Sequence, residues 1–166
     1  MDIRKIYEYA LQREYEGKRF FETNAARLSH AAAVAAFQRL AAEEQRHIEF
    51  VQAQLDALRS GQPAAVTIAA VDQELNKSGV FARRAETEFI DQTVMEAMTP
   101  DLPILRMAYL IERDFAEFYE QAAQKAEGEP RRALETLATW ERRHAALFKQ
   151  LHDRAFDEYA QMPWGG

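Results

Sequence analysis

The sequence EEQRH at residues 43–47 returns as WERRH at residues 140–144, so each half of the chain contains one Glu-x-x-His tetrapeptide. A glutamate and a histidine three positions apart share one face of an α-helix. The contexts match as well, because AFQRLAAEEQRHIEF at 36–50 can be overlaid on ALETLATWERRHAAL at 133–147. Both motifs are therefore predicted to lie on long helices that are copies of one another.

A second repeat precedes each motif. The stretch YALQREYEGKRFFETNA at 9–25 overlays MAYLIERDFAEFYEQAA at 107–123. The distance along the chain from Glu14 to Glu112 equals, within one residue, the distance from Glu44 to Glu141. Two copies of a helix hairpin predict a four-helix bundle with an approximate twofold axis through its core.

The whole chain, residues 1–166, is predicted to be all-α and to form one domain. Only 6 glycines and 5 prolines are present, and most of them stand at the expected joints between long helices. Apolar periodicity predicts the first helix over 2–28 and the second up to about residue 60, with Leu58 facing inward. We expect Asp101 to cap the third helix, Gly128 to end it, Pro130 to open the fourth and residues 161–166 to form a coil.

A long segment, residues 62–101, separates the second helix from the third. Antiparallel neighbours in a bundle are joined by much shorter loops, so this length lets the two helices run parallel. The stretch SGVFARRAETEFIDQTVMEAM at 78–98 has helical apolar spacing. We expect the crossover to contain shorter helical segments, which could dock on a partner subunit, with apolar positions Phe81, Phe89, Ile90, Val94 and Met98.

Composition excludes several classes of function. The net charge is -6 and no stretch is basic, which argues against a nucleic-acid partner. The chain has no cysteine, so disulfides, zinc ribbons and thiol chemistry are excluded. No apolar run approaches the roughly 18 residues of a membrane span. We expect a cytoplasmic protein with no membrane partner.

The polar residues of the repeats fall inside the apolar stripes of their helices. Four carboxylates converging in a core would repel one another and lose their hydration, which costs several kcal/mol each unless cations are present. Two divalent metal ions match them in charge, and oxygen and nitrogen ligands suit iron, with manganese or zinc possible. The predicted metal ligands are Glu14, Glu44, His47, Glu112, Glu141 and His144.

Other polar residues are given structural roles. His30 is expected at a joint and His152 at the surface, because neither has a matching partner in the repeat. Tyr7 and Tyr119 are expected first as core residues, although either could donate a hydrogen bond to a metal ligand. The remaining acidic residues near the motifs are expected on faces in contact with solvent or with another subunit: Glu16, Glu43, Asp114 and Glu117.

The segments ALQREYEGKRFFETNA, LAAEEQRHIEF, IERDFAEFYEQAA and LATWERRHAALF resemble the rubrerythrin branch of the ferritin-like di-iron superfamily. The resemblance covers nearly the whole chain except the crossover and the tail. It implies that the same six residues bind two irons, and that dioxygen or peroxide reacts at these irons. It also implies a homodimer.

Two departures from that family bear on function. Rubrerythrins carry a rubredoxin domain with a four-cysteine iron site, and a chain without cysteine would need an external electron donor. The family's extra glutamate, one turn after the third-helix ligand, is Phe115 here, which counts against efficient peroxidase activity. Phe115 corresponds to Gly17 in the repeat, and we expect the Gly17 side of the site to leave room for a small oxidant.

Three functions remain open from the sequence. The first is a di-iron oxidoreductase of oxidative-stress defence, which oxidises Fe(II) with peroxide or dioxygen. The second is iron handling, in which the same centre acts as a ferroxidase that serves storage. The third is a non-catalytic helical bundle, stabilised by zinc, with a binding or structural role.

Overall fold

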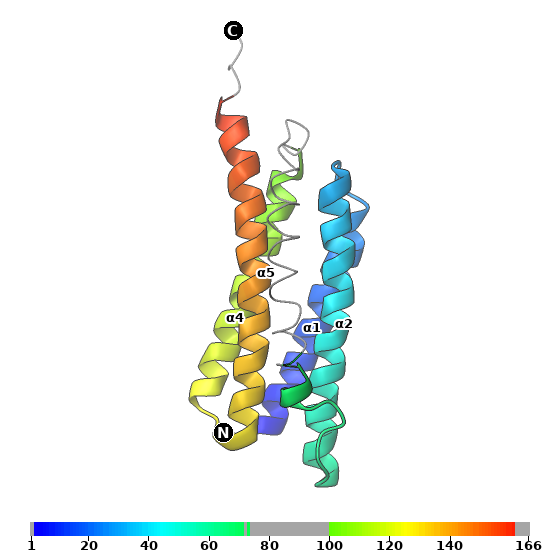
Figure 1. Cartoon of the computed structure of the whole chain (residues 1–166), viewed down its shortest axis with the longest axis vertical. Coiled ribbons are helices and arrows are strands. Elements are labelled where there is room, and N and C mark those ends of the chain that lie inside the picture. The colour runs from blue at the N-terminus through cyan, green and yellow to red at the C-terminus, as the bar shows by residue number, and fades with distance from the viewer. Residues whose placement is uncertain (1, 72, 74–99, 162–166) are drawn as a thin grey trace.

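The computed structural model describes residues 2–71, 73 and 100–161 (Figure 1). In these residues the regular structure is helical, which confirms the all-α class. Residues 68–71 form part of a further short helix, and no described helix is long and apolar enough to cross a membrane. The four long helices are α1 (Ile3–Ala25), α2 (Ala31–Ser60), α4 (Leu102–Gln124) and α5 (Gly128–Gln161).

The long helices form two hairpins that pack against each other. Helix α1 pairs with α2 and α4 pairs with α5, while α1–α4 and α2–α5 contacts join the two hairpins. Figure 1 shows α2 and α4 running in the same direction, as the long crossover predicted. Within the crossover, helix is described at residues 68–71, whereas the apolar positions expected between 81 and 98 lie outside the described residues.

Several helix ends follow the sequence. Helix α1 begins after Asp2, whose side chain accepts a hydrogen bond from the backbone N–H of Lys5. Helix α2 ends at Ser60, and Gly61 then adopts a φ of 68°, a left-handed conformation that glycine takes without strain. The last turns of α2 do differ from the prediction. Leu58 is 42% exposed, because α2, with 30 residues, extends past the start of the 23-residue α1.

Three other boundaries differ from the prediction. Helix α1 ends at Ala25 rather than Leu28, because the carbonyl of Asn24 accepts a turn hydrogen bond from Arg27. Helix α4 ends at Gln124, where short turn bonds to Ala122 and Ala123 close it, so Gly128 belongs to the start of α5. Helix α5 includes residue 161, the first of the predicted coil, and the remaining tail lies outside the described residues.

Asp101 stands at the N-cap position of α4, but its side chain makes no capping bond there. Its two carboxylate oxygens instead accept hydrogen bonds from the backbone N–H groups of Ser29, at 2.8 Å, and His30, at 3.1 Å. These residues immediately precede α2. The expected cap of α4 therefore ties the α1–α2 loop to the start of the second hairpin.

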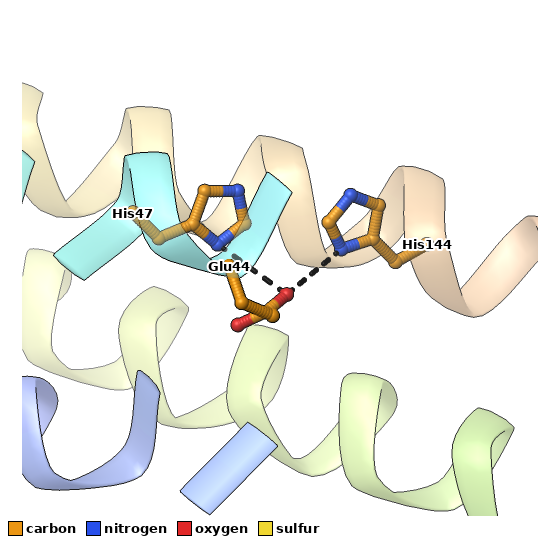
Figure 2. Close-up of side chains that lie close together, drawn as sticks. All are labelled: Glu44, His47 and His144. Atoms are coloured by element: carbon orange, nitrogen blue, oxygen red, sulfur yellow. Dashed lines mark ion pairs between the residues drawn. The ribbon is translucent and has the colours of Figure 1, made fainter. Parts of the chain in front are cut away.

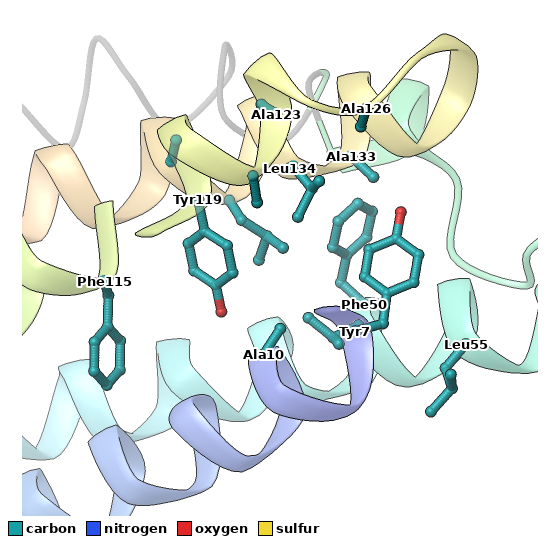
Figure 3. Close-up of a cluster of buried hydrophobic side chains, with 14 of the residues drawn as sticks. Tyr7, Ala10, Phe50, Leu55, Phe115, Tyr119, Ala123, Ala126, Ala133 and Leu134 are labelled. Carbon is teal, nitrogen blue, oxygen red and sulfur yellow. The ribbon is translucent and has the colours of Figure 1, made fainter. Parts of the chain in front are cut away.

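Two apolar clusters fill the core, and a polar layer separates them. On α1, Tyr7 and Ala10 belong to the first cluster and Phe21 to the second, with Glu14 between them. The same order holds along α4, where Glu112 lies between Leu105 and Tyr119. Figure 3 shows the first cluster, built by all four long helices. The buried glutamates and histidines are therefore enclosed by hydrophobic packing on two sides.

Candidate metal centre

All six predicted ligands meet in this polar layer. Helices α1 and α4 each contribute one glutamate, and α2 and α5 each contribute a glutamate and a histidine. The four carboxylates have no exposed surface, and the histidines are 1% and 5% exposed. Helical spacing alone brought each residue to the inner face, and the two hairpins bring the faces together. The residues are Glu14, Glu44, His47, Glu112, Glu141 and His144.

Two groups of four residues could each hold a metal ion, with ligand atoms within 4.8 Å of one another. One group contains Glu14 and His47, and the other contains Glu112 and His144. Glu44 and Glu141 belong to both groups. Two carboxylates shared between two ligand groups are the arrangement expected of two neighbouring metal positions with bridging glutamates.

The first group is arranged around Nδ1 of His47. This nitrogen lies 2.9 Å from Oε1 of Glu141, 3.1 Å from Oε2 of Glu14 and 3.6 Å from Oε1 of Glu44. One nitrogen of the ring therefore faces three carboxylates, each from a different helix.

The second group repeats this geometry around Nδ1 of His144. The nitrogen lies 3.2 Å from Glu112, 3.4 Å from Glu44 and 3.6 Å from Glu141. Figure 2 shows Glu44 between the two histidines, in contact with both. The two imidazole rings stack with centroids 5.3 Å apart and planes 10° apart. The repeat in the sequence thus appears in space as an approximately symmetric centre.

Several carboxylate oxygens of the centre lack a hydrogen-bond partner. Both side-chain oxygens of Glu44 and Glu141, and Oε1 of Glu112, are buried and accept no hydrogen bond of suitable geometry from the described residues, although imidazole nitrogens lie close to Oε1 of Glu44 and Oε1 of Glu141. Buried polar atoms are nearly always paired in native proteins, and an unpaired carboxylate is especially costly. Divalent cations would satisfy these oxygens, and the imidazole nitrogens beside them complete a set of hard and borderline ligands. The residues present therefore fit a pair of metal ions.

The electrostatics of the cluster also favour cations at this site. Burial, followed by repulsion from Glu141 and Glu44, raises the pKa of Glu14 and of Glu112 well above the usual range. These two carboxyls resist ionisation when only protein atoms surround them. A cation in the centre would reverse this effect by stabilising the charged form.

The pKa values of the two histidines and of the two shared glutamates shift in opposite directions. Burial alone would lower the pKa of His47, but the charges of Glu44 and Glu141 outweigh it and raise that pKa well above the ordinary value. Contacts with Glu112 raise the pKa of His144 in the same way, against the effect of burial. Burial opposes ionisation of Glu44 and Glu141, yet the neighbouring imidazoles lower the pKa of both. Without metal, protons supply the positive charge of the cluster.

No known protein family, curated protein or solved structure matches the chain. The ligand assignment therefore rests on the repeat in the sequence and on the geometry described above.

Glu43 corrects one expectation. The sequence placed it on a solvated or inter-subunit face, but its Oε2 lies 3.0 Å from Nε2 of His144. Burial opposes its ionisation, yet the hydrogen bond and charge of His144, helped by Arg39, lower the pKa of Glu43 to about 2. Glu43 stands four residues before His47, so helical spacing could have placed it beside the centre. By contrast, Glu16, Asp114 and Glu117 are exposed as expected.

Aromatic residues around the centre were only partly anticipated. The hydroxyl of Tyr119 donates a hydrogen bond to Oε1 of Glu14, in line with the suggested role, and Figure 3 shows it pointing towards α1. Tyr7 is buried in the first apolar cluster, as first expected, and its hydroxyl has no hydrogen-bond partner among the described residues. Trp140 stacks on the ring of His47, with centroids 4.4 Å apart, a contact that the sequence does not predict.

The space beside Gly17 is filled. A Cβ atom at this position would lie 3.1 Å from Cε2 of Phe115 and 3.2 Å from Oε2 of Glu44. The guanidinium of Arg13 covers the same Phe115 ring at 4.4 Å from its centroid. The expected room for a small oxidant on this side is therefore absent, because the repeat-equivalent phenylalanine occupies it.

Proposed function

We propose that the chain is a di-iron carboxylate protein with a ferritin-like four-helix bundle, which oxidises Fe(II) and reduces peroxide or dioxygen. The observation that carries the proposal is the pair of overlapping ligand groups that share Glu44 and Glu141. The side-chain oxygens of these two shared glutamates are buried and accept no hydrogen bond of suitable geometry from the described residues. The matched repeats and the parallel α2 and α4 support the fold part of the proposal.

Each ligand has a distinct place in this centre. Glu44 and Glu141 lie where they could bridge two ions, Glu14 and His47 would complete one position, and the second would be completed by Glu112 and His144. Four carboxylates balance the charge of two divalent ions. Iron held by these residues would supply the redox chemistry, a two-electron reduction of one hydrogen peroxide and two protons to two waters, with one electron from each of two Fe²⁺.

The composition of the ligand set favours iron. Carboxylates and imidazoles without sulfur suit iron or manganese, whereas structural zinc usually takes four ligands and needs fewer carboxylates. The resemblance to the rubrerythrin branch agrees with this choice. The chain contains no cysteine for an iron–sulfur donor, so an external reductant would return the centre to the ferrous state. The homodimer suggested by the resemblance remains a prediction.

The test is metal analysis of protein purified without oxygen, followed by stopped-flow absorbance after loading with two Fe²⁺ per chain. Mixing with hydrogen peroxide or with dioxygen should produce the absorption band of an oxo-bridged diferric centre. A faster reaction with hydrogen peroxide would indicate a peroxidase-like function, and a faster reaction with dioxygen would indicate a ferroxidase function.

The control is a double variant of the two shared glutamates, Glu44→Gln with Glu141→Gln. It should lose most of the metal and the absorption band but keep its helical circular dichroism, because the two apolar clusters supply most of the stability. Tight binding of zinc by the wild type, with no oxidation of loaded iron, would refute the redox function and leave a structural or binding role.

A further inference from the structure

The residue before the glutamate of each Glu-x-x-His motif reaches the histidine of the other motif. Glu43 of α2 contacts His144 of α5, and Trp140 of α5 stacks on His47 of α2. Glu43 and Trp140 occupy the same position of the repeat. The approximate symmetry of the centre is therefore broken by a carboxylate on one side and an indole on the other.

Glu43 fixes the orientation of the His144 ring. Oε2 of Glu43 lies 3.0 Å from Nε2 of His144, and an ionised carboxylate can only accept a hydrogen bond. A neutral imidazole bonded to it therefore carries its hydrogen on Nε2, and the lone pair of Nδ1 faces the buried carboxylates. Arg39 donates a hydrogen bond to the other oxygen of Glu43 at 2.8 Å, which holds the carboxylate in place. A carboxylate in this position orients a ligating histidine and strengthens it as a ligand.

His47 is held by different means. Its ring lies 4.4 Å from that of Trp140, with 17° between the planes. Stacking restrains the plane of the imidazole, but indole has only an N–H donor and cannot accept a hydrogen bond from the ring of His47. Within the described part of the chain, the polar contacts of His47 run through Nδ1 alone, to Glu14, Glu44 and Glu141.

We propose that Glu43 is a positioning residue that makes the His144 side, with Glu112, the tighter of the two metal positions. The His47 side, with Glu14, binds its ion more weakly. This inference rests on the metal centre of the proposed function. Loss of an outer carboxylate partner weakens metal binding by about 10- to 100-fold, so the two ions should bind in separable steps.

The experiment is a titration of the metal-free full-length chain with Co²⁺ alone, followed by calorimetry and by visible absorption. The wild type should bind two ions in two steps of different affinity. Glu112→Ala should remove the tighter step, and Glu14→Ala should remove the weaker one. These two variants assign each step to one side of the centre.

Variants of Glu43 then test the positioning role. Glu43→Ala should weaken the tighter step by about 10- to 100-fold and bring the two steps together. Glu43→Gln should retain part of the difference, because its amide oxygen can accept the same hydrogen bond. The control is Glu49→Ala, which removes an exposed glutamate of α2 bonded to Gln45 and should leave both steps unchanged. Circular dichroism checks that each variant folds.

Three results would overturn the proposal while leaving the metal centre intact. They are equal affinities for the two ions in the wild type, a tighter step that disappears in Glu14→Ala, and a Glu43→Ala variant whose steps are unchanged or equally weakened. A wild-type chain that binds no Co²⁺ would remove the proposed function as well.

Discussion

At the scale of single residues, Gly17 shows how the two copies of the hairpin pack where equivalent positions meet. Equivalent positions of the two hairpins face each other where α1 meets α4, and here Gly17 faces Phe115. Two phenylalanines at this position would compete for the same space. The Phe115 ring of α4 fills this space, and the equivalent residue of α1 is a glycine, whose side chain is a single hydrogen atom.

Gly17→Leu should destabilise the fold by about 1–3 kcal/mol, the usual cost of overpacking a core. The new side chain must displace the Phe115 ring and the Glu44 carboxylate, so metal binding should weaken as well. Urea denaturation of the metal-free protein measures the first effect, and a metal titration measures the second. In a Phe115→Ala background the penalty should shrink, because the ring is gone. An equal penalty in both backgrounds would contradict the packing described here.

At the scale of elements, Asp101 joins one hairpin to the other. It is buried, and it accepts two backbone hydrogen bonds at the end of the loop that leads into α2. Free N–H groups at a helix N-terminus favour a negative charge, so the carboxylate of the residue just before α4 stabilises the start of α2. The sequence identified Asp101 as a cap but could not name its partners, because they lie far away along the chain.

Asp101→Ala should lower the free energy of unfolding by about 1–3 kcal/mol, because two backbone donors lose a charged acceptor. Asp101→Asn keeps an acceptor oxygen without the charge and should lose less. Thermal and urea denaturation followed by circular dichroism give both values. Asp114→Ala, at an exposed aspartate within α4, is the matched control and should change stability little. A loss in the control as large as that in Asp101→Ala would show that the contact has no special role.

At the scale of the whole molecule, the sequence predicted the all-α class and the six residues of the centre, because both depend on helical spacing and on the repeat. It did not predict how Glu43 meets His144, how Trp140 meets His47 or how Phe115 fills the space at Gly17. Each of these contacts joins helices of different hairpins. They depend on the shift and rotation of one hairpin against the other, which periodicity along a single helix does not specify.

The charges of the assembled centre predict a steep pH dependence of metal binding. The pKa of Glu14 and Glu112 is raised, chiefly by burial, and carboxylates raise that of His47 and His144 despite burial. A raised pKa keeps a proton bound at higher pH, so metal must displace protons from these groups even near neutrality. Each displaced proton weakens binding about tenfold per pH unit as the pH falls.

The same pKa shifts determine how the stability of the metal-free protein changes with pH. In the metal-free protein, a raised pKa at these four groups contributes stability that is present in acid and is lost as the pH rises through the shifted values. Metal replaces the protons, so the rise in Tm on adding metal should be smaller near pH 5 than near pH 8 and should grow as the pH rises towards the shifted histidine pKa values, which lie above the ordinary imidazole value of about 6.5. Thermal denaturation with and without Co²⁺ across this range measures the difference. The Glu44→Gln, Glu141→Gln double variant, which changes both ligand groups, should show little shift at any pH. A wild-type shift that is independent of pH would argue that other residues bind the metal.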